Sequence, residues 1–116
     1  MAVTFENVRK LALSLGNVEE GTSYGTPAFK TAGVLFVRLR DDIDALVVRV
    51  NLDQREEMMA ADPETYFITD HYLDCPWILV RLSRVRPDAL PDLLRMAWQL
   101  AAKRPSPGKK PRASRR

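Results

Sequence analysis

The chain has 116 residues, of which 46% are hydrophobic and 28% are charged, and these values are ordinary for one globular domain. No run approaches the roughly 18 consecutive apolar residues of a membrane span, and the N-terminus lacks the pattern of a signal peptide. The single cysteine, Cys75, excludes an internal disulfide and fits a reducing compartment. We therefore expect a cytoplasmic protein with no membrane association.

The net charge of +3 is distributed unevenly along the chain. Residues 1–102 hold 11 Lys and Arg against 15 Asp and Glu, a net charge of −4, whereas residues 103–116 hold 7 Lys and Arg and no acid. We therefore expect one domain over residues 1–102 and a disordered basic tail over residues 103–116. Such a tail serves either as a solubilising extension or as an electrostatic arm for nucleic acid.

The first half of the chain predicts one helix and three strands. Thr4 is expected to cap a helix whose apolar residues recur at helical spacing, and Gly16 is placed to end it. Residues 18–26 have the composition of a loop, and a first strand is expected over residues 20–31. Pro27 lacks an N–H, which predicts that this strand lies at an edge or carries a bulge. Strands over residues 34–40 and 46–50 follow after short turns, which indicates an antiparallel meander.

The second half predicts two helices around two further strands. Residues 53–56 have capping-box spacing and open a helix that ends near Ala61, before Asp62-Pro63. Strands are expected over residues 66–69 and 77–83, and the last helix begins at Pro87-Asp88 with Pro91 in its first turn. The order α-β-β-β-α-β-β-α predicts an α+β two-layer sandwich, with helices on one face of an antiparallel sheet.

Alternation along the strands predicts two unlike sheet faces. The face that the helices cover is expected to be aliphatic, with Leu35, Val37, Leu39, Leu46, Val48, Val50, Ile78, Val80 and Leu82. The opposite face is expected to carry Phe36, Arg38, Arg40, Val47, Arg49, Trp77, Leu79 and Arg81. This arginine face is either a solvated surface whose arginines pair with aspartates at positions 41, 42, 44 or 74, or a platform for phosphates and bases.

No group of residues in the sequence indicates catalysis. His71 is the only histidine, and neither a second histidine nor clustered cysteines accompany it, so we expect no metal site and no cofactor. Cys75 has no histidine at a spacing typical of a nucleophile. The glycine-rich residues 21–25 lack the Lys-Ser/Thr ending of a P-loop. We therefore expect a protein without catalytic residues.

Several spaced blocks together resemble the MmcQ/YjbR family. They are Leu13-Ser14-Leu15, the run from Glu20 to Lys30, Gly33-Val34-Leu35-Phe36, His71-Tyr72 and the run from Pro76 to Val80. The resemblance covers residues 4–102 and implies an α-β3-α-β2-α fold, similar in outline to type III secretion chaperones. It further implies a DNA-binding protein that approaches the duplex in a double-wing mode. The residues implied to belong to the shared fold or surface are Tyr24, Pro27, Phe29, Lys30, His71, Tyr72, Pro76 and Trp77.

Together these features suggest a non-enzymatic protein, a monomer or weak homodimer, whose partner is double-stranded DNA. Contacts are expected mainly with the phosphate backbone, with low sequence specificity. The expected contact residues are Lys30, Arg38, Arg40, Arg49, Arg81 and Trp77 in the domain and Lys109, Lys110 and Arg112 in the tail. The alternative is a module that binds a protein or a small ligand and has no nucleic-acid role, which the acidic domain and the chaperone-like outline favour.

Overall fold

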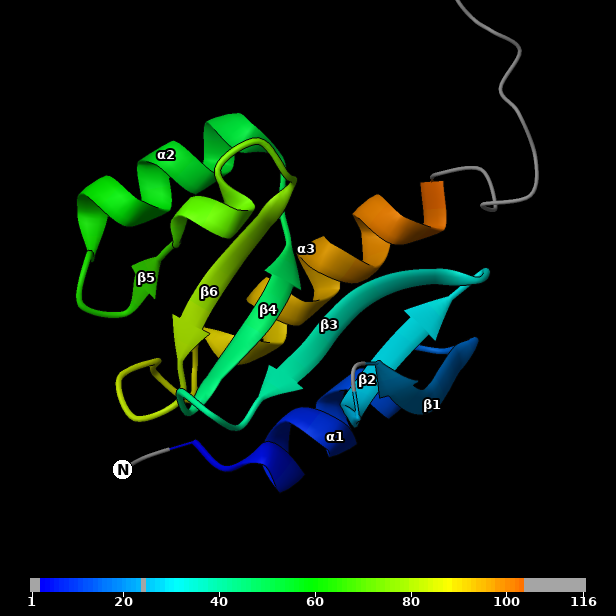
Figure 1. Ribbon diagram of the computed structural model, residues 1–116. Helices are drawn as coiled ribbons and strands as arrows, with labels where there is room; N and C mark the ends of the chain where they lie inside the picture. The colour runs from blue at the N-terminus through cyan, green and yellow to red at the C-terminus, as the bar shows by residue number, and fades with distance from the viewer. Residues whose placement is uncertain (1–2, 24, 104–116) are drawn as a thin grey trace, which may run out of the picture.

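The computed structural model describes residues 3–23 and 25–103 (Figure 1). The tail at residues 104–116 lies outside the described residues. Within these residues, three α-helices and six strands follow the order α-β4-α-β2-α, with a short 3-10 helix between the last two strands. Their bounds are α1 Phe5–Leu13, β1 Val18–Ser23, β2 Thr26–Thr31, β3 Val34–Arg40, β4 Ala45–Arg49, α2 Leu52–Ala61, β5 Tyr66–Phe67, η1 Asp70–Tyr72, β6 Trp77–Arg81 and α3 Leu90–Lys103.

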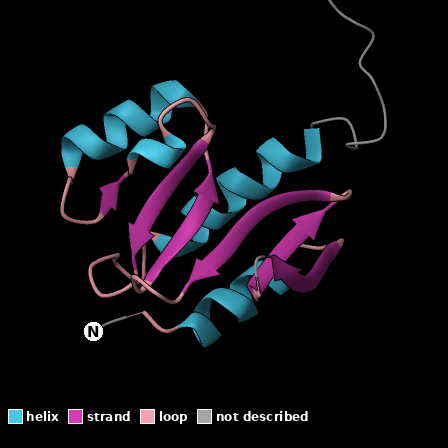
Figure 2. Cartoon of the chain, in the orientation of Figure 1, coloured by secondary structure: helices cyan, strands magenta, loops and turns pink. Residues whose placement is uncertain are grey.

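The strands form one antiparallel sheet in the order β1-β2-β3-β4-β6-β5. Helices α1 and α3 cover one face of this sheet, and α2 packs beside β5 and β6 at one end (Figures 1 and 2). The expected α+β class is confirmed. No helix within the described ranges is long and apolar enough to cross a membrane.

The helix boundaries follow from local hydrogen bonds. The Thr4 side chain accepts from the N–H of Asn7, whose side chain in turn accepts from the Thr4 N–H, so the expected cap of α1 is confirmed. Helix α2 begins at Leu52, and its cap is Asn51 rather than the expected Asp53. Helix α3, expected to begin at Pro87-Asp88, begins at Leu90, and Asp88 pairs with Arg86.

The segment expected to be a loop forms the edge strand β1. Residues 18–23 pair with β2, so four strands precede α2 and not three. Most side chains of β1 are exposed, as edge strands permit, and this explains why their polar composition resembles a loop. Pro27 consequently lies on the second strand, not the edge. The paired register of β2 with β3 begins only at Ala28, so Pro27 lies beyond the end of that ladder.

A β-bulge changes the predicted faces of β3. Phe29 pairs with Val37, but the next residue, Lys30, pairs with Leu35, so Phe36 is an extra residue. Phe36 and Val37 are therefore both fully buried on the helix side. The expectation that Phe36 lies on the arginine face and Leu35 on the covered face is wrong, because the bulge interrupts the two-residue alternation.

Two unequal clusters occupy the two faces. The main core lies between the sheet and the helices α1 and α3, and its fully buried side chains include Phe29, Phe36, Leu46, Ile78 and Leu94. The indole Nε1–H of Trp98 donates to the carbonyl of Gly16 at 3.0 Å and ties α3 to the segment after α1. On the opposite face, a smaller cluster contains Val47, Tyr72 and Leu79, so residues around η1 cover part of that side.

Candidate nucleic-acid interface

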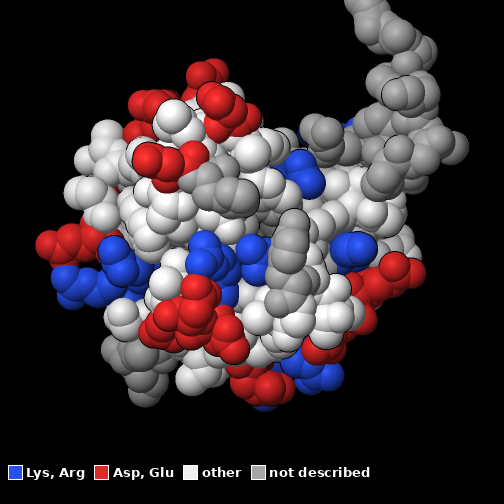
Figure 3. Space-filling view, in the orientation of Figure 1, with Lys and Arg blue, Asp and Glu red and all other residues white. Residues whose placement is uncertain are grey.

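The four predicted arginines lie on the open face of the sheet, the side away from α1 and α3. Arg38 and Arg40 come from β3, Arg49 from β4 and Arg81 from β6, and the cross-strand register sets them around Val47 and Ala45. Figure 3 shows basic side chains gathered at the centre of this face. Alternation along the strands therefore placed the arginines correctly, although it misplaced Leu35 and Phe36.

Arg40 is paired with an aspartate, as the solvated-surface interpretation expects. Arg40 donates to Asp42 through Nη2 to Oδ2 at 2.6 Å and through Nε to Oδ1 at 3.2 Å. The hydrogen bonds from the guanidinium lower the pKa of Asp42, and the carboxylate raises the pKa of Arg40 in return. Arg40 therefore carries its own counter-charge.

Arg38, Arg49 and Arg81 each contact an uncharged group on this face. Arg38 Nη2 donates to the Tyr72 hydroxyl at 3.3 Å. Arg49 Nε donates to the carbonyl of Leu35 at 2.8 Å, and its guanidinium lies 4.5 Å from the centroid of the Trp77 ring. The guanidinium of Arg81 lies 4.2 Å from the centroid of the Phe67 ring. Such contacts orient a guanidinium without cancelling its charge.

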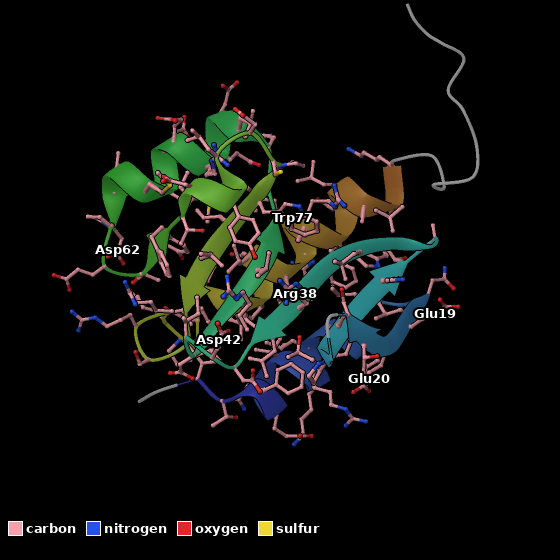
Figure 4. The ribbon with its side chains drawn as sticks, in the orientation of Figure 1. Glu19, Glu20, Arg38, Asp42, Asp62 and Trp77 are labelled. Carbon is pink, nitrogen blue, oxygen red and sulfur yellow. The ribbon has the colours of Figure 1, made fainter. Side chains whose placement is uncertain are left out.

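A groove of about 850 Å³ opens on this face. It is lined by Thr26, Leu35, Arg38, Arg40, Asp41, Asp42, Val47, Tyr72, Cys75 and Trp77. Leu35 reaches the groove because the bulge turns it away from the helices. In Figure 4, Trp77 and Asp42 lie on opposite sides of Arg38. The groove thus combines apolar and aromatic groups with basic groups, and it has carboxylates at one end.

Arg55 is the structural residue that the sequence analysis missed. It lies on α2 and is only 5% exposed. Its Nη1 donates to the carbonyls of Tyr72, Cys75 and Trp77 at 3.0, 2.8 and 3.3 Å, and its Nη2 donates to that of Leu73 at 2.8 Å. It therefore fixes residues 72–77, which form one wall of the groove. One sequence feature could have indicated that Arg55 is buried: it lies three and four residues before Met58 and Met59, and so on the same side of the helix as these apolar side chains.

The remaining predicted residues are dispersed. Lys30 is exposed on β2 opposite Leu35 but does not line the groove, while Phe29 is fully buried and serves the core. Pro27 is half-buried in β2, and the hydroxyl of the buried Tyr72 accepts from Arg38. The backbone of His71 belongs to η1. The predictions for Tyr24, Lys109, Lys110 and Arg112 fall outside the described residues.

No three His, Cys, Asp or Glu side chains of the described residues gather closely enough to hold a metal ion. Cys75 is half-buried, and its carbonyl accepts from Arg55. The side chains that line the groove carry guanidinium, carboxylate, hydroxyl, thiol, aromatic and aliphatic groups.

The fold is that of an α+β domain. One face of its sheet is aliphatic and covered by helices, and the other is open and carries basic side chains. Residues 13–100 match the family model of YjbR, and the chain belongs to the YjbR family. The structure is similar to the crystal structure of the Deinococcus radiodurans protein DR2400, which contains the domain DUF419. The two share a TM-score of 0.75 and 23% sequence identity, over 88% of this chain and 80% of that one. At this identity the likeness establishes the fold alone. No curated protein matches the chain.

Proposed function

We propose that this protein is a non-enzymatic DNA-binding protein that contacts mainly the phosphate backbone. The observation that carries the proposal is the gathering of Arg38, Arg40, Arg49 and Arg81 on one open sheet face. The planar guanidinium group matches the geometry of phosphate oxygens and remains charged at all physiological pH values. Contacts of this kind orient a protein on DNA but carry little sequence information.

The arginines are not expected to contribute equally. Arg40 is already paired with Asp42, so its attraction for phosphate is partly offset. Arg38 donates to the Tyr72 hydroxyl, and the guanidinium groups of Arg49 and Arg81 lie over the rings of Trp77 and Phe67. Acidic side chains of α2 and of the turn after β3 border the basic centre (Figure 3). Attraction is therefore local to this face, with the basic tail as a second source.

The test is the electrophoretic mobility of duplex DNA at two salt concentrations. Three full-length proteins are compared: the natural chain, the face variant R38Q/R81Q, and a tail variant with Lys109, Lys110 and Arg112 replaced by Gln. Each lost phosphate contact should lower the slope of log affinity against log salt by about one. The control is R86Q, which removes an exposed arginine paired with Asp88 outside the sheet. Absence of a mobility shift with the natural chain at low salt would refute the proposal.

A further inference from the structure

The groove is concave and has apolar side chains at its base. Contacts with the phosphates of a duplex require neither feature. A DNA duplex presents its phosphates on a convex outer surface and keeps the faces of its bases stacked inside. A depression of about 850 Å³ with apolar groups at its base has no counterpart on such a surface. Its complement is a ligand that inserts a flat apolar group and carries an anion beside it.

The base of the groove, called its floor below, is apolar and can stack against the flat face of a nucleobase. Leu35, Val47 and Trp77 line it, and they come from the neighbouring strands β3, β4 and β6. Every nucleobase has an aromatic face, and proteins that bind single strands use aromatic and apolar side chains as stacking surfaces. Because the bulge turns Leu35 onto this side, the floor is wider than strict alternation would make it.

Charges give the groove a direction. At one end, Arg38 lines the groove beside Trp77, and the guanidinium of Arg49, which is not itself a lining residue, lies over the Trp77 ring. At the other end, Asp42 lies beyond Arg38 (Figure 4), and its neighbour Asp41 also lines the groove. A phosphate is attracted to the first end and repelled from the second.

The walls of the groove are already held in place. Arg55 fixes residues 72–77 through four carbonyls. Arg49 is held between the Leu35 carbonyl and the Trp77 ring. A site whose parts need no ordering at the moment of binding loses less entropy when its ligand enters.

We infer from this arrangement that the groove binds an unpaired nucleotide of DNA, with the base on Leu35, Val47 and Trp77 and the phosphate at Arg38 and Arg49. The inference rests on the proposed function and deepens it: the protein binds single-stranded or locally unpaired DNA more tightly than a perfect duplex. Free nucleotides share this chemistry, and the experiment separates the two sources.

The first experiment measures the affinity of the full-length protein by fluorescence anisotropy for four probes. These are a labelled decamer of deoxythymidine, an abasic decamer of equal length and charge, a duplex decamer, and thymidine monophosphate as an unlabelled competitor. The thymidine decamer should bind about five- to hundred-fold more tightly than the abasic decamer, as expected for one stacked base. It should also bind more tightly than the duplex. Competition by the monophosphate at millimolar concentration would identify the isolated nucleotide as sufficient.

The second experiment observes the two tryptophans of the chain by NMR. The indole N–H signal of Trp77 should shift on addition of the thymidine decamer. That of Trp98, which donates to Gly16 away from the groove, should stay in place and serves as an internal control. The variant W98F assigns the two signals. The variant W77L should reduce the preference for the thymidine decamer over the abasic decamer to less than about twofold, and this ratio is meaningful even if the variant is less stable.

The outcomes separate the inference from the proposed function. Equal affinity for the thymidine and abasic decamers, or a preference for the duplex, would overturn the inference while phosphate binding stands. An unmoved Trp77 signal at saturating thymidine decamer would overturn it as well. If no nucleic-acid probe binds at low salt, both fail together.

Discussion

The two faces of the sheet are built from alternate residues of the same strands, yet they follow different rules. On the helix side, aliphatic and phenyl side chains such as Phe36, Leu46 and Ile78 are completely buried. On the open side, arginines lie over aromatic rings around a small cluster and a groove. The covered face therefore holds most of the buried apolar surface, and the open face carries the arginines on which the proposed binding rests. Substitutions on the two sides should separate stability from affinity.

The open face also shows how a sheet can present arginines in fixed positions. Arg49 and Trp77 are direct cross-strand partners on β4 and β6, and the guanidinium of Arg49 lies over the indole ring. Phe67 on β5 holds Arg81 in the same manner. Cross-strand pairs on one sheet face stabilise the strands that carry them. The aromatic rings thus stabilise the sheet and also orient the charged guanidinium groups.

The largest expected difference between the faces is in stability. Leu94 on α3 is fully buried against the covered face, and L94A should lower the free energy of unfolding by about 2–5 kcal/mol because it leaves a cavity. Leu35 is only half-buried on the open face, and L35A should cost less than about 1.5 kcal/mol. Urea denaturation followed by circular dichroism measures both.

The same pair should behave in the opposite way in binding. L35A should weaken binding of the thymidine decamer several-fold, whereas folded L94A, measured well below its unfolding midpoint, should retain the natural affinity. If L35A were as destabilising as L94A, the separation of roles between the two faces would be wrong.

The second prediction concerns the wall of the groove. R55M keeps much of the side-chain volume but removes the guanidinium that donates to the carbonyls of residues 72, 73, 75 and 77, of which those of 72 and 75 keep a backbone N–H donor. Unsatisfied buried groups are costly, so the free energy of unfolding should fall by about 2–4 kcal/mol. Hydrogen exchange should show the loss of protection concentrated between residues 72 and 80 rather than in α1.

The matched control for this variant is R95M on α3. Arg95 is exposed and lies 3.7 Å from Asp92, and its loss should change stability by less than about 0.5 kcal/mol. Equal effects of the two substitutions would show that Arg55 does not hold residues 72–77 in solution.

The contrast between the faces also explains what could be predicted from the sequence. Period-two alternation correctly placed the four arginines, because an aliphatic and a charged position cannot exchange sides without a large cost. It failed at Leu35 and Phe36, because the bulge inserts one residue into β3, which contains neither proline nor glycine. Pro27, from which an edge position or a bulge was predicted, lies on the partner strand β2. Strand β1 was missed because an exposed edge strand has no apolar stripe.

The groove could not have been predicted from the pattern of the strands alone. Its wall depends on Arg55, a residue from α2 that donates to carbonyls about twenty positions further along the chain. Carbonyl groups are present at every residue, so their arrangement around one guanidinium leaves no trace in side-chain identity. Contacts between a side chain and backbone groups far away in the sequence therefore cannot be predicted from the strand pattern, and the wall of the groove depends on such contacts.

The smallest expected effect concerns the pair at the rim of the groove. The hydrogen bonds from Arg40 lower the pKa of Asp42 in the folded protein. Because the folded pKa is depressed, the pairing stabilises the protein above the ordinary carboxyl pKa near 4 and is lost as the pH falls through the lower folded value. A carbon-detected NMR titration should find Asp42 titrating below the ordinary aspartate pKa, and R40Q should return it to the ordinary range.

The same pair tests the electrostatic direction of the groove. D42N removes a negative charge and leaves Arg40 without its counter-ion, so affinity for the thymidine decamer should rise by about two- to threefold at low salt and converge with the natural protein at high salt. D53N on α2 removes an equal charge away from the groove and should have a smaller effect. An equal rise for D42N and D53N would mean that only net charge matters and that the arrangement of charges along the open face does not direct the ligand.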